Sequence, residues 1–158
     1  METYQTLKIL HGIAVAVPLL AIVGLAWYGW RSWRSWRGGD AGVLAKALLR
    51  IGLAAWVLVA GSVVSLPLTG WQMVHRAGFP LGQTWLLASA CLLILVAIFW
   101  LLFTSRLWRI RALAVSARDS GEPLAERVVR ELRFGAAFFA LALLSWLAIL
   151  ALMLAKPL

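Results

Sequence analysis

Few residues of this chain could do chemistry, because its long apolar runs contain no Asp or Glu. Lys8 and His11 stand three residues apart where the first apolar run begins, and Lys156 follows the end of the last run. An ionisable group at or within a membrane span indicates a functional site by default. The absence of carboxylates in the runs argues against a proton relay or a cation-coupled transport site.

The histidine and the cations around it are typical of a haem site. A neutral imidazole inside a helical bundle is a good axial ligand for haem iron, and cationic side chains near the membrane interface suit the haem propionates. His11 would be the metal ligand, and Lys8, Arg76 and Lys156 would pair with propionates. Lys156 is also a conceivable second ligand. The pattern predicts b-type haem used for electron transfer or porphyrin redox chemistry, with quinone or a respiratory membrane protein as partner.

Three alternatives stay open. Lys8 and His11 can extend to the outer membrane surface along their apolar stems, with Lys156 as a terminal anchor. Copper binding or transport would use thioether and imidazole ligands. The residues of that set are His11, Met73, His75 and Met153. The chain can also be a non-catalytic accessory or assembly subunit of a larger membrane complex, so the residues leave open whether it is an enzyme.

The elements that must position these residues are four apolar runs, at about 9–30, 51–73, 84–105 and 134–155. Each holds about twenty residues, which at about 1.5 Å per residue crosses a hydrocarbon core about 30 Å thick. Charged residues make up 13% of the chain, against about 25% in soluble domains. We therefore predict an all-α fold, a four-transmembrane-helix bundle that forms a single integral membrane domain over residues 1–158.

The positive charges predict how the helices are oriented. The connections at 31–50 and 106–133 are rich in arginine, whereas the connection at 74–83 has Arg76 as its one Lys or Arg residue. Short loops rich in Lys and Arg stay in the cytoplasm. We therefore expect both termini on the outer, periplasmic side of a bacterial inner (cytoplasmic) membrane. This orientation gathers the candidate haem site in the outer half of the bundle.

The sequence WRSWRSWR at 30–37 is the most unusual feature of the chain. Tryptophan prefers the membrane interface, and arginine there meets anionic lipid headgroups. Binding of nucleic acid would need this basic patch to project from a soluble fold, which the composition excludes. The stretch is therefore predicted to anchor the cytoplasmic end of the first helix in the lipid bilayer. Arg106, Arg109, Arg130 and Arg133 are expected to extend the last two helices beyond the membrane, with no function of their own.

Two prolines lie inside the first two runs. Pro18 shares a helix face with His11, and Pro67 lies near the end of the second run beside Ser65 and Thr69. A proline inside a helix removes a backbone hydrogen bond and tends to bend the helix. We therefore expect two broken helices and a cavity at the level of the polar cluster.

Five short motifs in order give the chain a family resemblance. They are LKILH at 7–11, LPLTG at 66–70, Gly82 with WLL at 85–87, RIRALA at 109–114 and LMLAKP at 152–157. The set resembles a family of bacterial predicted integral membrane proteins, domain of unknown function family 2269. That family is in turn distantly similar to HemJ-type protoporphyrinogen oxidases and CopD-type copper-resistance membrane domains.

The HemJ-type proteins also open with Lys-x-Leu-His on the first helix and end with Lys-Pro. This similarity implies a b-type haem on the histidine and an essential lysine, roles that would fall here on His11 and Lys156. The chain differs from the HemJ-type pattern in having four spans and in lacking its extended arginine-rich segment after the first helix. The resemblance therefore implies the fold more directly than the enzymatic activity.

Overall fold

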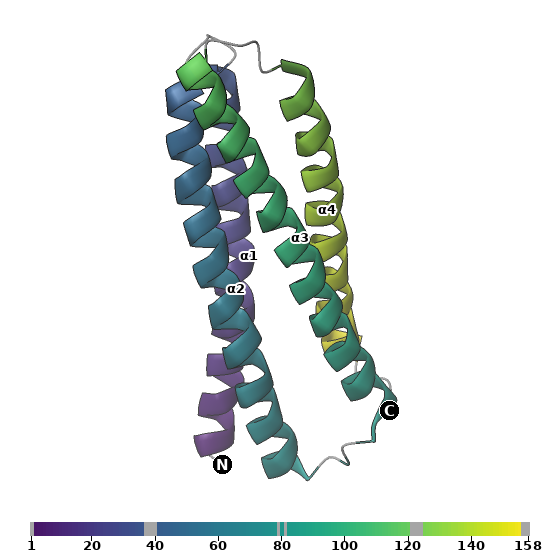
Figure 1. Cartoon of the computed structure of the whole chain (residues 1–158). Helices are drawn as coiled ribbons and strands as arrows, with labels where there is room; N and C mark the ends of the chain where they lie inside the picture. The colour runs from purple at the N-terminus through teal and green to yellow at the C-terminus, as the bar shows by residue number, and fades with distance from the viewer. Residues whose placement is uncertain (1, 37–40, 79, 81, 121–124, 156–158) are drawn as a thin grey trace.

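The computed structural model consists of four long helices (Figure 1). They are α1 (Glu2–Trp36), α2 (Ala41–Ala77), α3 (Thr84–Ser120) and α4 (Ala125–Ala155). The structure describes residues 2–36, 41–78, 80, 82–120 and 125–155, among which there is no strand. All four helices are long and apolar enough to cross a membrane. The predicted all-α fold with four membrane-spanning helices is confirmed.

Each helix is longer than a bilayer requires. The shortest has 31 residues and the longest 37, which at about 1.5 Å per residue gives about 46 to 56 Å against a hydrocarbon core of about 30 Å. The excess includes the arginines: Arg106 and Arg109 lie within α3, and Arg130 and Arg133 lie within α4. The predicted extension of these two helices past the apolar runs is therefore observed.

The bundle is built from two helical hairpins, α1–α2 and α3–α4. Each helix packs on the next along the chain, whereas no described residues of α1 and α4 have Cα atoms within 8 Å of each other. Contacts between α2 and α3 join the two hairpins. Helix α3 crosses the bundle diagonally, so that α2 and α3 lie together where α3 ends and separate towards the end where α3 begins (Figure 1).

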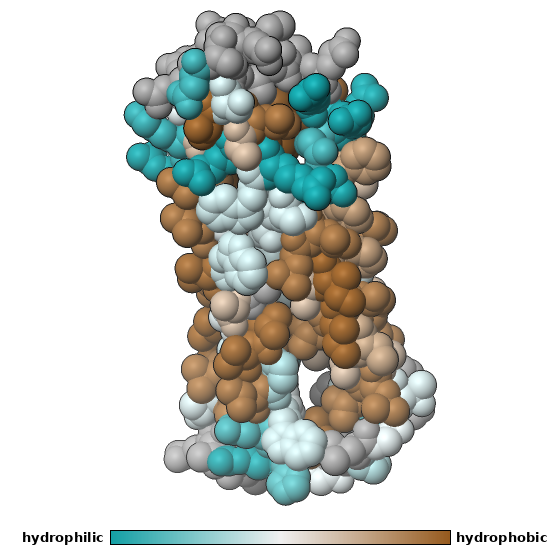
Figure 2. Space-filling view, viewed as in Figure 1, coloured by the Kyte–Doolittle hydropathy of each residue, from teal (hydrophilic) through white to brown (hydrophobic). Residues whose placement is uncertain are grey.

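The two ends of the bundle differ in character. We call the end where α1 begins and α4 ends the histidine end, because it holds both histidines, and the opposite end the arginine end. Figure 2 shows a brown belt of apolar side chains between the ends, and teal charged residues concentrated at the arginine end. This pattern is that of a membrane-spanning bundle with one basic interface. The charge rule predicts that the arginine end is cytoplasmic.

The core of the bundle is centred on Trp100 of α3. Its indole is buried among Ile22 of α1, Ala55 of α2 and Ala142 of α4, so this cluster joins all four helices. The indole Nε1–H donates a 3.2 Å hydrogen bond to the backbone oxygen of Ala55. Because this tryptophan satisfies its polar atom inside the bundle, it can fill the centre without leaving an unpaired donor in the membrane.

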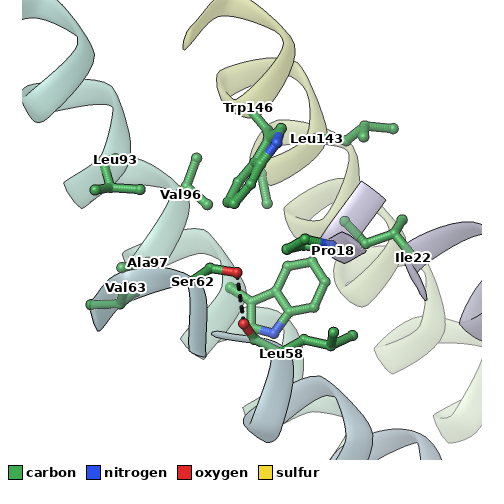
Figure 3. Close-up of a pocket in the computed structure, with 12 residues that line it drawn as sticks. Pro18, Ile22, Leu58, Ser62, Val63, Leu93, Val96, Ala97, Leu143 and Trp146 are labelled. Carbon is green, nitrogen blue, oxygen red and sulfur yellow. Dashed lines mark hydrogen bonds between the residues drawn. The ribbon is translucent and has the colours of Figure 1, made fainter. Parts of the chain in front are cut away.

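The prolines do not divide their helices as expected. Helices α1 and α2 continue without interruption through Pro18 and Pro67. Pro18 is buried and lines a small apolar cavity in the middle of the bundle, with Trp146 on the facing wall (Figure 3). The cavity volume is only about 20 Å³, and the hydroxyl of Ser62 in its wall donates to the backbone oxygen of Leu58. The structure thus shows an apolar cavity in the middle of the bundle, and the cavity predicted at the polar cluster stays a prediction.

Candidate functional site

The candidate site at the histidine end consists of one interhelical hydrogen bond and the glycine beside it. The imidazole Nδ1 of His11 on α1 lies 2.7 Å from the Oγ1 of Thr69 on α2. His11 is half-buried and lies about 10 Å along α1 from Tyr4, where the candidate span begins. The ring therefore lies between α1 and α2, inside the candidate membrane span.

The hydroxyl of Thr69 has hydrogen-bond partners in its own helix besides His11. Thr69 Oγ1 donates to the backbone oxygen of Ser65, 2.7 Å away in the preceding turn. A hydroxyl has one proton, so with that proton engaged it accepts from the Nδ1–H of His11. The neutral ring then carries its lone pair on Nε2. An imidazole held in this way by a hydrogen bond on one nitrogen is oriented to bind iron with the other.

Gly70 lies beside the imidazole of His11. A Cβ atom built on Gly70 would lie 3.6 Å from the Cε1 of His11, which is ordinary van der Waals contact. A larger side chain would therefore reach the edge of the ring beside Nε2. The LPLTG motif at 66–70 thus supplies both the hydrogen-bond partner and the open position that the histidine of the LKILH motif requires. Sequence reasoning recognised the two motifs but not the contact between them.

Among the described residues, the structure shows no hydrogen bond between His11 and the cations that were predicted to surround the haem. Lys8 on α1 and Arg76 near the end of α2 are both exposed at the histidine end, and neither forms an ion pair with a described residue. Their positions suit contacts with groups near the membrane surface. Lys156 lies outside the described residues, so both roles predicted for it stay predictions.

The predicted copper set is spread over α1, α2 and α4, and its two members on α2 lie on different faces of that helix. Met73 follows Thr69 by four residues and shares its face, whereas His75 follows by six and points about 120° away from it. The His75 ring is exposed and stacks on Trp71 with ring centres 6.1 Å apart. Met153 lies half-buried on α4. Among the described residues no three His, Cys, Asp or Glu side chains gather in a group that could hold a metal ion.

The arginine end holds an ion pair that sequence reasoning missed. Arg106 Nη1 on α3 donates to Glu131 Oε2 on α4 at 2.8 Å, and the two side chains are 25% and 14% exposed. The guanidinium carbon of Arg106 also lies 5.5 Å from the ring centre of Phe134. The available signal was a single glutamate close to the start of an apolar run. The sequence shows that charge but does not indicate that it faces another helix.

Comparison with known protein families identifies the family of this chain. The family described as predicted integral membrane protein (DUF2269) matches residues 5–157. The chain belongs to this family. As a DUF2269 member it is a multi-pass integral membrane protein, in agreement with its four helices. No curated protein and no solved structure matches the chain. The similarity to HemJ-type and CopD-type proteins stays a prediction.

Proposed function

We propose that this DUF2269 protein binds b-type haem through His11 at the histidine end of the bundle and uses it for electron transfer or porphyrin redox chemistry. The observation that carries the proposal is the 2.7 Å contact between His11 Nδ1 and Thr69 Oγ1. With Nδ1–H donating to Thr69, Nε2 would keep its lone pair for a metal ion. An oriented neutral imidazole inside an apolar bundle has the properties of an axial haem ligand.

The surroundings of His11 fit a haem in two respects. The Cε1 edge of the ring faces Gly70, so no side chain from this position of α2 covers that edge. Lys8 and Arg76 lie exposed at the same end, where they would meet propionates near the membrane surface. Bound beside His11, haem would supply one-electron chemistry at its iron.

The residues of the chain would have separate roles in such a site. His11 would ligate, Thr69 would fix the tautomer and the ring orientation, and Gly70 would keep the ring edge accessible. The apolar walls formed by α1 and α2 would exclude water and so favour a neutral imidazole. The site would lie in the outer half of a bacterial inner membrane if the arginine end is cytoplasmic, as the charge rule predicts.

The alternatives have less support. Extension of His11 to the membrane surface does not agree with a half-buried ring bonded to α2. A copper site would need His75, whose ring is turned away from Thr69 and stacks on Trp71. The apolar side chains exposed around the bundle are what a lipid-facing surface requires, so they do not favour an accessory subunit with a protein partner. A quinone or a protein as electron partner belongs to the proposal.

An absorption spectrum of the detergent-purified full chain, expressed with added haem precursor, tests the proposal. We expect a Soret band with stoichiometric iron, and we expect His11→Ala to abolish it. The matched control is His75→Ala, which removes the other imidazole at the same end and should leave the band unchanged.

Two results would overturn the proposal. One is a colourless protein without iron that also fails to bind added haemin. The other is a Soret band that survives His11→Ala, which would place the ligand elsewhere. Stoichiometric copper lost from both His11→Ala and His75→Ala would instead support the copper alternative.

A further inference from the structure

A basic cleft lies between α3 and α4 at the arginine end, away from the histidine site. Its volume is about 770 Å³, and it is open to solvent. Its lining residues are Arg109, Ala112 and Leu113 of α3 and Arg127, Arg130 and Glu131 of α4. Residues three or four apart share a helix face, so one face of each helix supplies its side of the cleft.

The charge of the cleft is positive because its carboxylate is already engaged. Glu131 accepts the 2.8 Å hydrogen bond from Arg106, which lies outside the cleft lining. Arg109, Arg127 and Arg130 are exposed, and none of them forms an ion pair with a described carboxylate. Three guanidinium groups thus border one cleft, and the single charge of Glu131, which attracts Arg109 and Arg130 as well as Arg106, does not cancel theirs. Guanidinium groups bind phosphate oxygens through paired N–H donors.

Residues typical of a membrane interface flank the cleft. Trp108, next to Arg109, packs its indole against Gly52 of α2, with the guanidinium of Arg111 5.4 Å from the ring centre. Tryptophan and arginine together are typical of the membrane interface. Ala112 and Leu113 give the cleft an apolar wall beside its charges, and in Figure 2 the teal band of charged residues adjoins the brown belt.

We propose that this cleft binds the phosphate headgroup of an anionic phospholipid from the leaflet at the arginine end. Basic pockets between transmembrane helices at the cytoplasmic interface are suited to anionic headgroups. The lipid would connect α3 and α4 through Arg109 on one side and Arg127 and Arg130 on the other. This site is independent of haem, since it lies at the opposite end of the bundle.

Native mass spectrometry of the purified full chain, titrated with phosphatidylglycerol or phosphatidylcholine, tests this assignment. We expect preferential binding of phosphatidylglycerol. Each guanidinium near an anionic headgroup is worth about fivefold in affinity. The combined variant Arg109→Gln, Arg127→Gln, Arg130→Gln should therefore bind phosphatidylglycerol about 100-fold more weakly, with little change for phosphatidylcholine.

The matched control removes the same charge from the same end, on α1 and α2 outside the cleft. It combines Arg34→Gln, Lys46→Gln and Arg50→Gln, and we expect a change in phosphatidylglycerol affinity within about twofold. An equal loss in both triple variants would overturn the assignment, because the attraction would then be diffuse. If the cleft triple variant does not fold, Arg127→Gln and Arg130→Gln are measured singly, with about a fivefold loss expected for each.

A third measurement separates the lipid from a free anion. Inorganic phosphate at millimolar concentration should leave bound phosphatidylglycerol in place, because the apolar wall of Ala112 and Leu113 contributes only to lipid binding. Complete displacement of the lipid by inorganic phosphate would overturn the lipid assignment and identify a site for free phosphate.

Discussion

The histidine end and the arginine end of the bundle place polar groups between helices in opposite ways. At the histidine end one neutral ring is held by one hydroxyl, with a glycine beside it. At the arginine end an ion pair joins α3 and α4, and a layer of buried apolar residues packs α2 against the same two helices. The layer consists of Leu44, Ala45, Leu48, Ile51, Leu107, Ile110, Ala114 and Val128.

The two ends therefore differ in whether these interhelical polar groups remain available to a ligand. The interhelical ion pair uses both charges internally, so neither is available to a ligand. The single hydrogen bond of His11 leaves one nitrogen of the same ring available. We therefore expect substitutions at the arginine end to affect unfolding most, and substitutions at the histidine end to affect haem binding most.

The largest effect on stability is expected from Arg106→Ala. Removing one partner of a buried ion pair costs about 3 to 5 kcal/mol, and the partial exposure of this pair reduces the expected loss to about 2 kcal/mol. Thermal unfolding in detergent, followed by circular dichroism, measures the change. Arg133→Ala, an exposed arginine on α4, is the control and should change the free energy of unfolding by less than about 0.5 kcal/mol.

Adding Glu131→Ala to Arg106→Ala should restore part of the lost stability, because the double variant no longer contains an unpaired carboxylate. The Soret band should be unchanged in both variants. A loss of haem from Arg106→Ala without unfolding would contradict the separation of the two ends.

Compared with Arg106→Ala, we expect Thr69→Val to have a smaller effect on stability and a larger effect on haem affinity. Valine keeps the shape of the side chain and removes the acceptor for His11. Loss of one hydrogen bond costs about 1 kcal/mol of stability. Loss of a group that orients a metal ligand costs about 10- to 100-fold in affinity, measured here by titration with haemin. Thr69→Ser keeps the hydroxyl and should retain most of the affinity.

The outcome that would contradict this role is an unchanged haem affinity in Thr69→Val. A second check is a double-mutant cycle for stability. In the His11→Ala background, Thr69→Val should cost clearly less than in the wild type, because the partner of the hydroxyl is already absent.

The smallest effect is expected from Gly70→Ala. The added Cβ would lie 3.6 Å from His11 Cε1, an ordinary contact, so stability and haem absorbance should stay close to wild type. Gly70→Leu should displace the imidazole and remove the Soret band. Gly61, where an added Cβ meets nothing within 4 Å, provides the control: Gly61→Leu should retain the band. Equal loss from both leucine variants would show that Gly70 has no specific role.

Much of the fold could be read from local properties of the sequence. A run of about twenty apolar residues predicts a membrane-spanning helix because every backbone polar group must be satisfied within the segment itself. The same approach failed at Pro18 and Pro67. Proline predicts a defect in a helix, but neighbouring side chains can pack around it, and Pro18 is buried against α3 and α4 in an intact helix.

The candidate site was only partly predictable. His11 stood out because an ionisable group within a span is rare, which is a property of one position. Its bond to Thr69, 58 residues away, depends on the register between α1 and α2, and no local pattern reports that register. The ion pair of Arg106 with Glu131 was missed for the same reason.

The sequence by itself determined that four helices cross a membrane, which residues in them can ionise, and which connections carry the positive charge. These properties follow from the hydropathy of short segments, since each helix forms its own hydrogen bonds wherever its neighbours lie. The tertiary structure alone decided which residue hydrogen-bonds to His11, which carboxylate pairs with Arg106, and which three arginines share a cleft. Each of these results depends on how one helix is rotated and shifted against the next. The packing of side chains between helices determines that geometry.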